Sequence, residues 1–226
     1  MKTTVSTNFM FAGILFAACL LISNILAVKI IMIGPWAAPA GVLIFPVSYI
    51  INDVIAEVWG YKKVRLIIWA GFAVNIMAIL FYSLSIAMPA ASFWGNQSAY
   101  STILSNTPRI AVASLVAYLV GSFMNAWVMS RVKVLTNGKN FSFRAVLSTI
   151  AGEGMDSTLF ISIAFAGLFP SNVLLTMILT QAFIKVAFEM IALPLTIMVV
   201  KWIKRDEGID TFDTEISYNP FKLSEI

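Results

Sequence analysis

Six long apolar stretches alternate with short polar connections along the chain. Since about 20 apolar residues in a helix cross the roughly 30 Å of bilayer hydrocarbon, each stretch is long enough to span a membrane. The predicted spans are residues 9–31, 39–59, 66–88, 110–129, 146–169 and 173–200, the last continuing into Trp202. Gly34-Pro35-Trp36 is expected to form the first turn, and the longest connection, 89–108, holds Trp94 and Tyr100, aromatic residues suited to a membrane interface. The pattern predicts an all-α polytopic membrane protein with six transmembrane helices.

The composition agrees with this class and excludes several others. Of the 226 residues, 60% are hydrophobic and 12% are charged, with a mean hydropathy of +0.90, whereas soluble domains carry about 25% charged residues. The chain has no histidine, which removes His-based metal sites, histidine general bases and the usual catalytic triads. Its one cysteine, Cys19, lies in an apolar stretch and indicates no disulfide framework. We expect no metal ion, no cofactor and no enzymatic activity.

The basic residues are concentrated in three segments and predict the orientation. They are Lys62, Lys63 and Arg65 after the second span, Arg131, Lys133, Lys139 and Arg144 after the fourth, and Lys201, Lys204 and Arg205 after the sixth. By the positive-inside rule these segments and both termini are cytoplasmic. This topology explains the net charge of +4, so nucleic-acid binding is not predicted. We expect residues 1–205 to form a transmembrane transporter domain in the cell inner membrane, and residues 206–226 to form a polar cytoplasmic tail without regular structure.

The acidic residues are placed where selection for solubility would not put them. Six of the eleven lie in the tail after residue 205. The other five lie inside or at the ends of predicted spans: Asp53, Glu57, Glu153, Asp156 and Glu189. An ionised acid near the bilayer centre costs about 2.5–3.5 kcal/mol on insertion scales. These side chains are therefore expected to face a cavity, a partner or one another, and they are functional candidates by default.

Helical spacing groups the acids into pairs. Asp53 and Glu57 are four residues apart and lie on one helical face, although Glu57 is near enough to the end of its span to reach the headgroups instead. Glu153 and Asp156 are three residues apart, with Ser157 beside them. The two acids of each pair are therefore expected to lie on the same side of their helix.

Two features of these spans have both a structural and a functional interpretation. Gly152 and Gly154 let another backbone come close, which serves a binding site or plain helix packing. Gln181, Lys185 and Glu189 recur at intervals of four, so Lys185 either binds a ligand or pairs with Glu189 and neutralises it.

The order of polar residues indicates a weak internal symmetry. Ser23-Asn24 before Lys29 in the first span corresponds to Ser122 and Asn125 before Arg131 in the fourth. Spans two and five each carry paired acids, and spans three and six each carry a polar residue in an apolar run. Because three is odd, two three-helix repeats would have opposite orientations, as in many secondary transporters. The alternative is a chance alignment of apolar helices.

Four motifs give the chain a resemblance to a known family. They are FPVSYIINDVIAEVWGYKKVR, GSFMNAWVMSRVK, AGEGMDSTLFISIAF and QAFIKVAFEMIALPLTIMVVKWIKR. In order and spacing they resemble the queuosine precursor transporter family, also grouped with vitamin uptake transporters, over residues 9–205. The resemblance implies inner-membrane uptake of 7-deazaguanine bases, such as 7-cyano-7-deazaguanine, for tRNA modification. The positions that match the family's motif residues are Asp53, Glu57, Arg65, Glu153, Asp156, Ser157, Lys185 and Glu189, while Asn125 stands where members often have an acid.

The candidate side chains suit such a substrate. A carboxylate accepts two hydrogen bonds at once from the adjacent N–H and NH₂ groups of a guanine-like edge. Lys185 or Asn24 can donate to the carbonyl oxygen of the base, and Phe160, Trp127 or Tyr49 can stack on its ring. Acids beyond those that the ligand needs can carry protons or cations for coupling.

Two other functions are compatible with parts of the sequence. One is a substrate-binding membrane subunit that needs a separate energising complex, since the chain has no GxxxxGK[ST] motif of its own. The other is an intramembrane aspartyl protease with Asp53 and Asp156 on separate spans. Such proteases carry GxGD, whereas Met155 separates Gly154 from Asp156 here and rotates the aspartate by about 100°.

Overall fold

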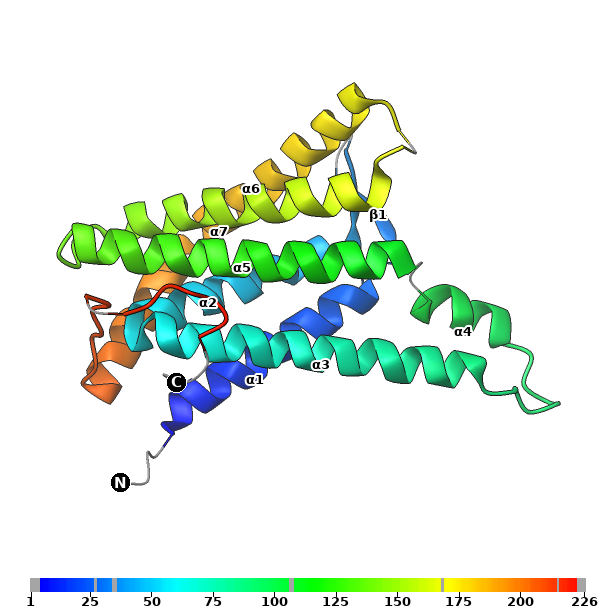
Figure 1. Ribbon diagram of the computed structural model, residues 1–226, viewed down its shortest axis with the longest axis horizontal. Coiled ribbons are helices and arrows are strands. Elements are labelled where there is room, and N and C mark those ends of the chain that lie inside the picture. The colour runs from blue at the N-terminus through cyan, green and yellow to red at the C-terminus, as the bar shows by residue number, and fades with distance from the viewer. Residues whose placement is uncertain are drawn as a thin grey trace.

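The computed structural model describes residues 5–26, 28–33, 36–105, 108–167, 169–214 and 216–222. In these ranges the chain forms seven α-helices, a short 3₁₀ helix and a two-stranded hairpin (Figure 1). The helices are α1 (Thr7–Leu26), α2 (Phe45–Trp59), α3 (Tyr61–Ala87), α4 (Gln97–Leu104), α5 (Pro108–Leu135), α6 (Phe141–Phe165) and α7 (Ser171–Glu207). Strand β1 (Ile30–Ile33) pairs antiparallel with β2 (Trp36–Pro39), and the 3₁₀ helix η1 (Ala40–Leu43) leads into α2. The predicted helical class is confirmed.

Four helical segments are long and apolar enough to cross a membrane, within the residues described. They are α1, α3, α7 and residues Val112–Leu135 of α5. Helix α2 has only 15 residues, and α6 carries Arg144, Glu153 and Asp156. The structure thus supports a multi-pass membrane protein, and the count of six spans stays a prediction.

The first two helices are shorter than their apolar stretches predicted. Helix α1 ends at Leu26, so Lys29 lies beyond the helix, and the β-branched run that follows pairs as a strand. Helix α2 begins at Phe45 because Pro46, which has no N–H to donate, is tolerated only in a first turn. Gly34 and Pro35 of the expected turn lie outside the described residues. The connection 89–108 is also not wholly irregular, because it contains α4.

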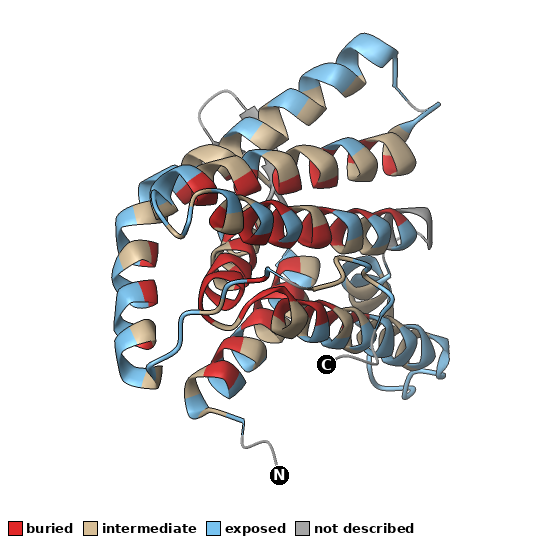
Figure 2. Ribbon diagram, turned by 60° about the vertical axis from the view of Figure 1, so that its left-hand side comes forward, coloured by how far each residue is buried: buried red, intermediate tan, exposed pale blue. Residues whose placement is uncertain are grey.

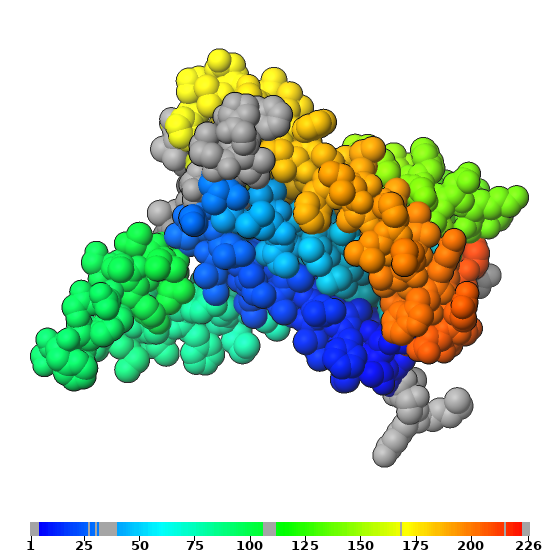
Figure 3. All heavy atoms as spheres, turned by 180° about the vertical axis from the view of Figure 1, so that it is seen from behind, coloured from blue at the N-terminus to red at the C-terminus, as the bar shows by residue number. Residues whose placement is uncertain are grey.

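Six helix ends meet at one end of the bundle. The start of α1 reaches the end of α7, where Asn8 donates to Asp206 over 2.7 Å, and the backbone N–H of Thr211 reaches the Val58 carbonyl at the end of α2. Helices α3 and α6 begin, and α5 ends, on the same side (Figure 1). Helix α4 lies at the opposite end (Figures 1 and 3), and so does the hairpin (Figure 1). We call the first side the basic end, because it carries Lys62, Lys63, Arg131, Lys139 and Lys204.

Buried positions lie on the sides of the helices that face one another (Figure 2). Many of the exposed positions are large apolar residues. Ile191 and Leu195 of α7 and Phe81 of α3 are among the large exposed apolar side chains. A helix that is apolar on its outer face as well is typical of a membrane span. The interior, by contrast, holds many of the polar and charged residues.

Helices α5 and α6 cross closely at Gly121 and Gly152. A Cβ atom added to either glycine would lie 3.0 Å from the carbonyl oxygen of the other. An added Cβ at Gly152 would also lie 2.7 Å from Cβ of Asn125 and 2.9 Å from Cε1 of Tyr49. The close approach predicted for Gly152 and Gly154 is therefore confirmed at Gly152 and wrong at Gly154, where an added Cβ would meet open space.

We expect Gly152→Ala to lower the stability of the folded protein by about 1–3 kcal/mol, because the added methyl overpacks the crossing. Gly154→Ala is the matched control, since a Cβ there has no atom within 4 Å. Thermal unfolding in detergent measures both variants. Equal losses at the two positions would contradict the packing at this crossing.

Candidate functional site

Twelve polar side chains are buried together between four helices, and we call this group the polar core. Each of its members is shielded from solvent. They are Tyr49, Asn52 and Asp53 of α2, Ser122 and Asn125 of α5, Ser148, Thr149, Glu153, Asp156 and Ser157 of α6, and Lys185 and Glu189 of α7.

Regular helical spacing brings these groups to the same place. On α6, Thr149, Glu153 and Ser157 recur every four residues, so they lie on one face beside Asp156. On α7, Lys185 and Glu189 are likewise four residues apart. Because the polar faces of four helices point inward, the ionisable groups are held away from the apolar outer surface.

Lys185 binds two acids of α6. Its Nζ atom lies 2.7 Å from Oε2 of Glu153 and 2.5 Å from Oδ2 of Asp156, and it also lies 4.2 Å from the ring centroid of Phe45. The self-neutralising pair between Lys185 and Glu189 is thus replaced by ion pairs between α7 and α6. Among the described residues of the polar core, there are four carboxyl groups and one ammonium group, so the acids outnumber the cations.

The remaining acids contact neutral polar groups. Ser148 lies 3.4 Å from both carboxylate oxygens of Asp53, which also faces Glu189 and Asn125. Asn52 donates to the side-chain oxygen of Asn125 over 2.6 Å, which joins α2 to α5. Asp53 and Asp156 therefore have different neighbours, Glu189 and Lys185, and do not form the shared-proton pair of an aspartyl protease.

Several buried atoms of the polar core lack a hydrogen-bond partner in the protein. They are Tyr49 OH, Asn52 Oδ1, Asn125 Nδ2, Thr149 Oγ1, both oxygens of Glu153, Ser157 Oγ and Glu189 Oε2. Some of these atoms have polar neighbours outside hydrogen-bond geometry: Oε2 of Glu153 has its ion pair with Lys185, Thr149 faces Glu189, and Asn125 faces Asp53. An unsatisfied buried polar group costs about 1–3 kcal/mol, so a cluster of them indicates a place for a polar ligand or water.

Glu57 belongs to a second cluster, at the basic end. Its carboxylate accepts from both terminal nitrogens of Arg144, one over 3.1 Å, and from Lys204 over 2.5 Å. Lys133 lies 3.6 Å away and donates to the Glu57 carbonyl over 2.6 Å. Glu57 is 1% exposed, so it does not reach toward the headgroups. Its carboxylate is already paired with three cations.

Asp210 extends this second cluster beyond α7. It pairs with Lys133, and with Lys204 over 2.9 Å. Partial burial opposes ionisation, but the hydrogen bonds from the two lysines outweigh it and hold the pKa of the Asp210 carboxyl below its usual value. The residues Glu57, Lys133, Arg144, Lys204 and Asp210 form the basic-end cluster.

Asn24 lies in neither cluster. It lines a cavity of about 260 Å³ between α1, α3, α4 and α5, where it donates to Asn75 over 2.5 Å and lies 3.4 Å from the Ser114 hydroxyl. Ser114 is on the same stripe of α5 as Tyr118, Ser122 and Asn125. The cavity therefore lies along a polar stripe that leads toward the polar core.

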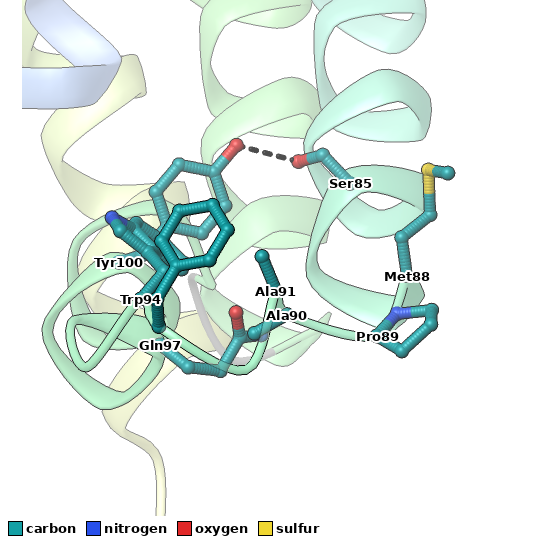
Figure 4. A pocket seen from close by; sticks show the side chains of 9 residues that line it. Ser85, Met88, Pro89, Ala90, Ala91, Trp94, Gln97 and Tyr100 are labelled. Atoms are coloured by element: carbon teal, nitrogen blue, oxygen red, sulfur yellow. Dashed lines mark hydrogen bonds between the residues drawn. The ribbon is translucent and has the colours of Figure 1, made fainter.

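A shallower hollow of about 460 Å³ lies where α3 meets α4 (Figure 4). The hydroxyls of Ser85 and Tyr100 are 2.8 Å apart, and the rings of Trp94 and Tyr100 meet edge to face at 5.7 Å. Its lining residues carry no charge. This aromatic, uncharged surface agrees with the interface position expected for residues 89–108.

The aromatic candidates are divided between inside and outside. Tyr49 lies in the polar core, whereas Trp127 is 43% exposed and Phe160 packs against Phe165.

Several buried polar residues were not predicted to belong to a site. The candidates did not include four members of the polar core, Asn52, Ser122, Ser148 and Thr149, although the four-residue spacing from Thr149 to Glu153 would have found Thr149. Arg144 and Lys133 were predicted only to set the orientation in the membrane. In the structure they are buried partners of Glu57.

A multi-pass helical bundle with ionisable residues gathered in its interior is the arrangement of a membrane transporter. The comparison with known proteins agrees. The chain belongs to the family described as "Putative vitamin uptake transporter", which matches residues 39–199.

Curated relatives carry a more specific description. The chain is 27% identical to a "Probable queuosine precursor transporter" of Bacillus subtilis, over 82% of this chain and 81% of that protein. It is 31% identical to a protein of the same description from Haemophilus influenzae, over 55% of this chain and 51% of the relative. No solved structure matches the chain significantly. The predicted family membership is confirmed.

Proposed function

We propose that this protein takes up queuosine precursors, 7-deazaguanine bases such as 7-cyano-7-deazaguanine, as a secondary transporter of the inner membrane with both termini cytoplasmic. The observation that carries the proposal is the set of unpaired polar atoms in the polar core. Family membership and the descriptions of the relatives support the substrate class.

In the proposed complex one acid of the set Asp53, Glu153 and Asp156 accepts the paired donors of the base. Lys185 donates to the carbonyl oxygen, because its ammonium group already lies among these acids. Tyr49 is the aromatic residue placed to contact the ring, since it is the candidate buried in the core. Asn125, Ser157 and Glu189 supply the remaining polar contacts, and Asn24 contacts the base earlier, in the cavity beside α4.

We further propose that acids not engaged by the base carry protons. The polar core has more carboxyl groups than Lys185 can neutralise, so binding of a neutral base leaves at least one carboxyl free to exchange a proton. For Glu57 we propose a structural role instead, because its carboxylate is already paired with three cations.

Recognition of the guanine-like edge predicts discrimination against adenine. Adenine lacks the adjacent pair of donors, so a buried carboxylate that meets it stays unpaired and binding loses several kcal/mol. In cells that express this protein, unlabelled adenine should compete with labelled 7-cyano-7-deazaguanine much more weakly than 7-deazaguanine bases do, with guanine in between. Equal competition by adenine and guanine would contradict carboxylate recognition and favour stacking.

A further inference from the structure

The described residues after α7 form a strap across the basic end. We use the name C-terminal strap for residues 209–214 and 216–222. These residues contain no helix or strand, and they lie along the ends of α2, α3 and α5. They lie beyond residue 199, where the family match ends. The strap therefore lies outside the residues that the family model matches.

Helix α3 holds the later part of the strap through buried donors. Arg65 is fully buried, and its Nη1 atom donates to the carbonyls of Ser217 over 3.3 Å and Asn219 over 2.9 Å. The indole N–H of Trp69 donates to the Pro220 carbonyl over 2.8 Å. Because an unpaired buried charge is costly, this guanidinium holds the strap in place until departure of the strap lets water replace the two carbonyls.

Asp213 fastens the middle of the strap to α3 and α5. It is 5% exposed and accepts from the backbone N–H of Tyr61 over 2.9 Å and from the hydroxyl of Ser130. The first N–H groups of a helix have no partner within the helix, so a carboxylate there is stabilised by hydrogen bonding and by the helix dipole. Gly60 leaves room for this contact, since a Cβ at that position would lie 2.8 Å from Oδ1 of Asp213.

Asp210 fastens the start of the strap to the basic-end cluster. Through Lys133 and Lys204 it is linked to α5 and α7, and through the same lysines to Glu57 of α2. The strap thus joins four helices at one end of the bundle. Three of them, α2, α5 and α7, also supply the polar core. A path from the core to the basic end requires these helix ends to separate.

We propose that the C-terminal strap is a releasable lock that keeps the basic end closed, and that it must detach each time the polar core opens to that side. The role of the lock in a transport cycle rests on the proposed function. Its effect on solvent access to the helix ends, however, does not depend on any substrate. Charged and hydrogen-bonded contacts suit such a lock, because water replaces them when the strap leaves.

A reversible cross-link tests the lock in the full chain. Ser130→Cys and Asp213→Cys, in a Cys19→Ser background, place two thiols where the hydroxyl and carboxylate now touch. Bridging them with a short cleavable thiol reagent should abolish uptake of labelled base, and reduction should restore it. The two single-cysteine variants treated in the same way are the controls. Undiminished uptake by the cross-linked protein would overturn the proposal.

Thiol labelling tests the lock without any substrate. Ala145→Cys, in the same background, introduces a thiol at a position that is 1% exposed, next to Arg144 of the basic-end cluster. A chain ended after Gly208 should react with a membrane-impermeant maleimide several-fold faster than the full chain, from the side of the membrane that the basic end faces. An unchanged rate in a truncated protein that is still folded would overturn the lock. If the truncated chain unfolds, the cross-linking experiment alone tests the proposal.

Discussion

Asp156→Asn is expected to abolish uptake while the protein still inserts and folds. Asp156 and Glu153 of α6 both pair with Lys185. The amide removes one negative charge, but the ammonium of Lys185 keeps Glu153 as its counter-ion, so no buried charge is left alone. The fold should therefore tolerate the change.

Binding of the base, in contrast, should be lost. Asparagine offers one acceptor oxygen where aspartate offers two, and its NH₂ group opposes a donor. Losing a charge-assisted hydrogen bond of about 3 kcal/mol corresponds to a roughly 100-fold loss. Initial rates of uptake of labelled 7-cyano-7-deazaguanine, normalised to the amount of membrane-inserted protein, measure it. Asp206→Asn, at the exposed end of α7, is the control, and near-normal uptake by Asp156→Asn would assign Asp156 a structural role only.

Glu57→Gln is expected to destabilise the protein strongly. The glutamine would leave Lys133, Arg144 and Lys204 gathered around a neutral group at the basic end. Breaking a buried ion pair by removing one partner costs about 3–5 kcal/mol, because the remaining charge is uncompensated. Thermal unfolding in detergent and the yield of inserted protein should both fall.

Asp210→Asn is the matched control for Glu57→Gln. It removes a carboxylate that contacts two of the same lysines, but the Asp210 side chain is 47% exposed. Solvent-exposed ion pairs contribute about 0–1 kcal/mol, so the loss should be small. Comparable losses in the two variants would show that burial of Glu57 does not set the strength of its pairing.

The sequence predicts the helical class and most of the polar core, because both follow from local pattern. Apolar stretches of about 20 residues predict α3, α5, α6 and α7, although several helix ends differ from the predicted ends by four to six residues, as at Leu135 of α5. Acids inside such stretches cannot face lipid at low cost, so the sequence predicts that Asp53, Glu57, Glu153, Asp156 and Glu189 face inward. It does not separate Glu57, which pairs with Arg144 at the basic end, from the other four.

The parts that sequence reasoning missed depend on contacts between distant segments. Spacing alone pairs Lys185 with Glu189 on one helix, whereas the fold brings Lys185 to Glu153 and Asp156. Arg144 follows a connection rich in basic residues, and its burial against Glu57 has no local signal. The strap has a polar composition without periodicity, so its order comes from partners elsewhere in the chain, such as Arg65.

The central claim is that this single chain moves the base across a membrane. The most direct measurement is uptake of labelled 7-cyano-7-deazaguanine by proteoliposomes that contain only the purified protein, with and without an imposed proton gradient. We predict accumulation that depends on the protein, is accelerated by an inward proton gradient and is lost in Asp156→Asn. Binding of the base without accumulation under either condition would contradict the claim and would indicate a substrate-binding subunit that needs a separate energising complex.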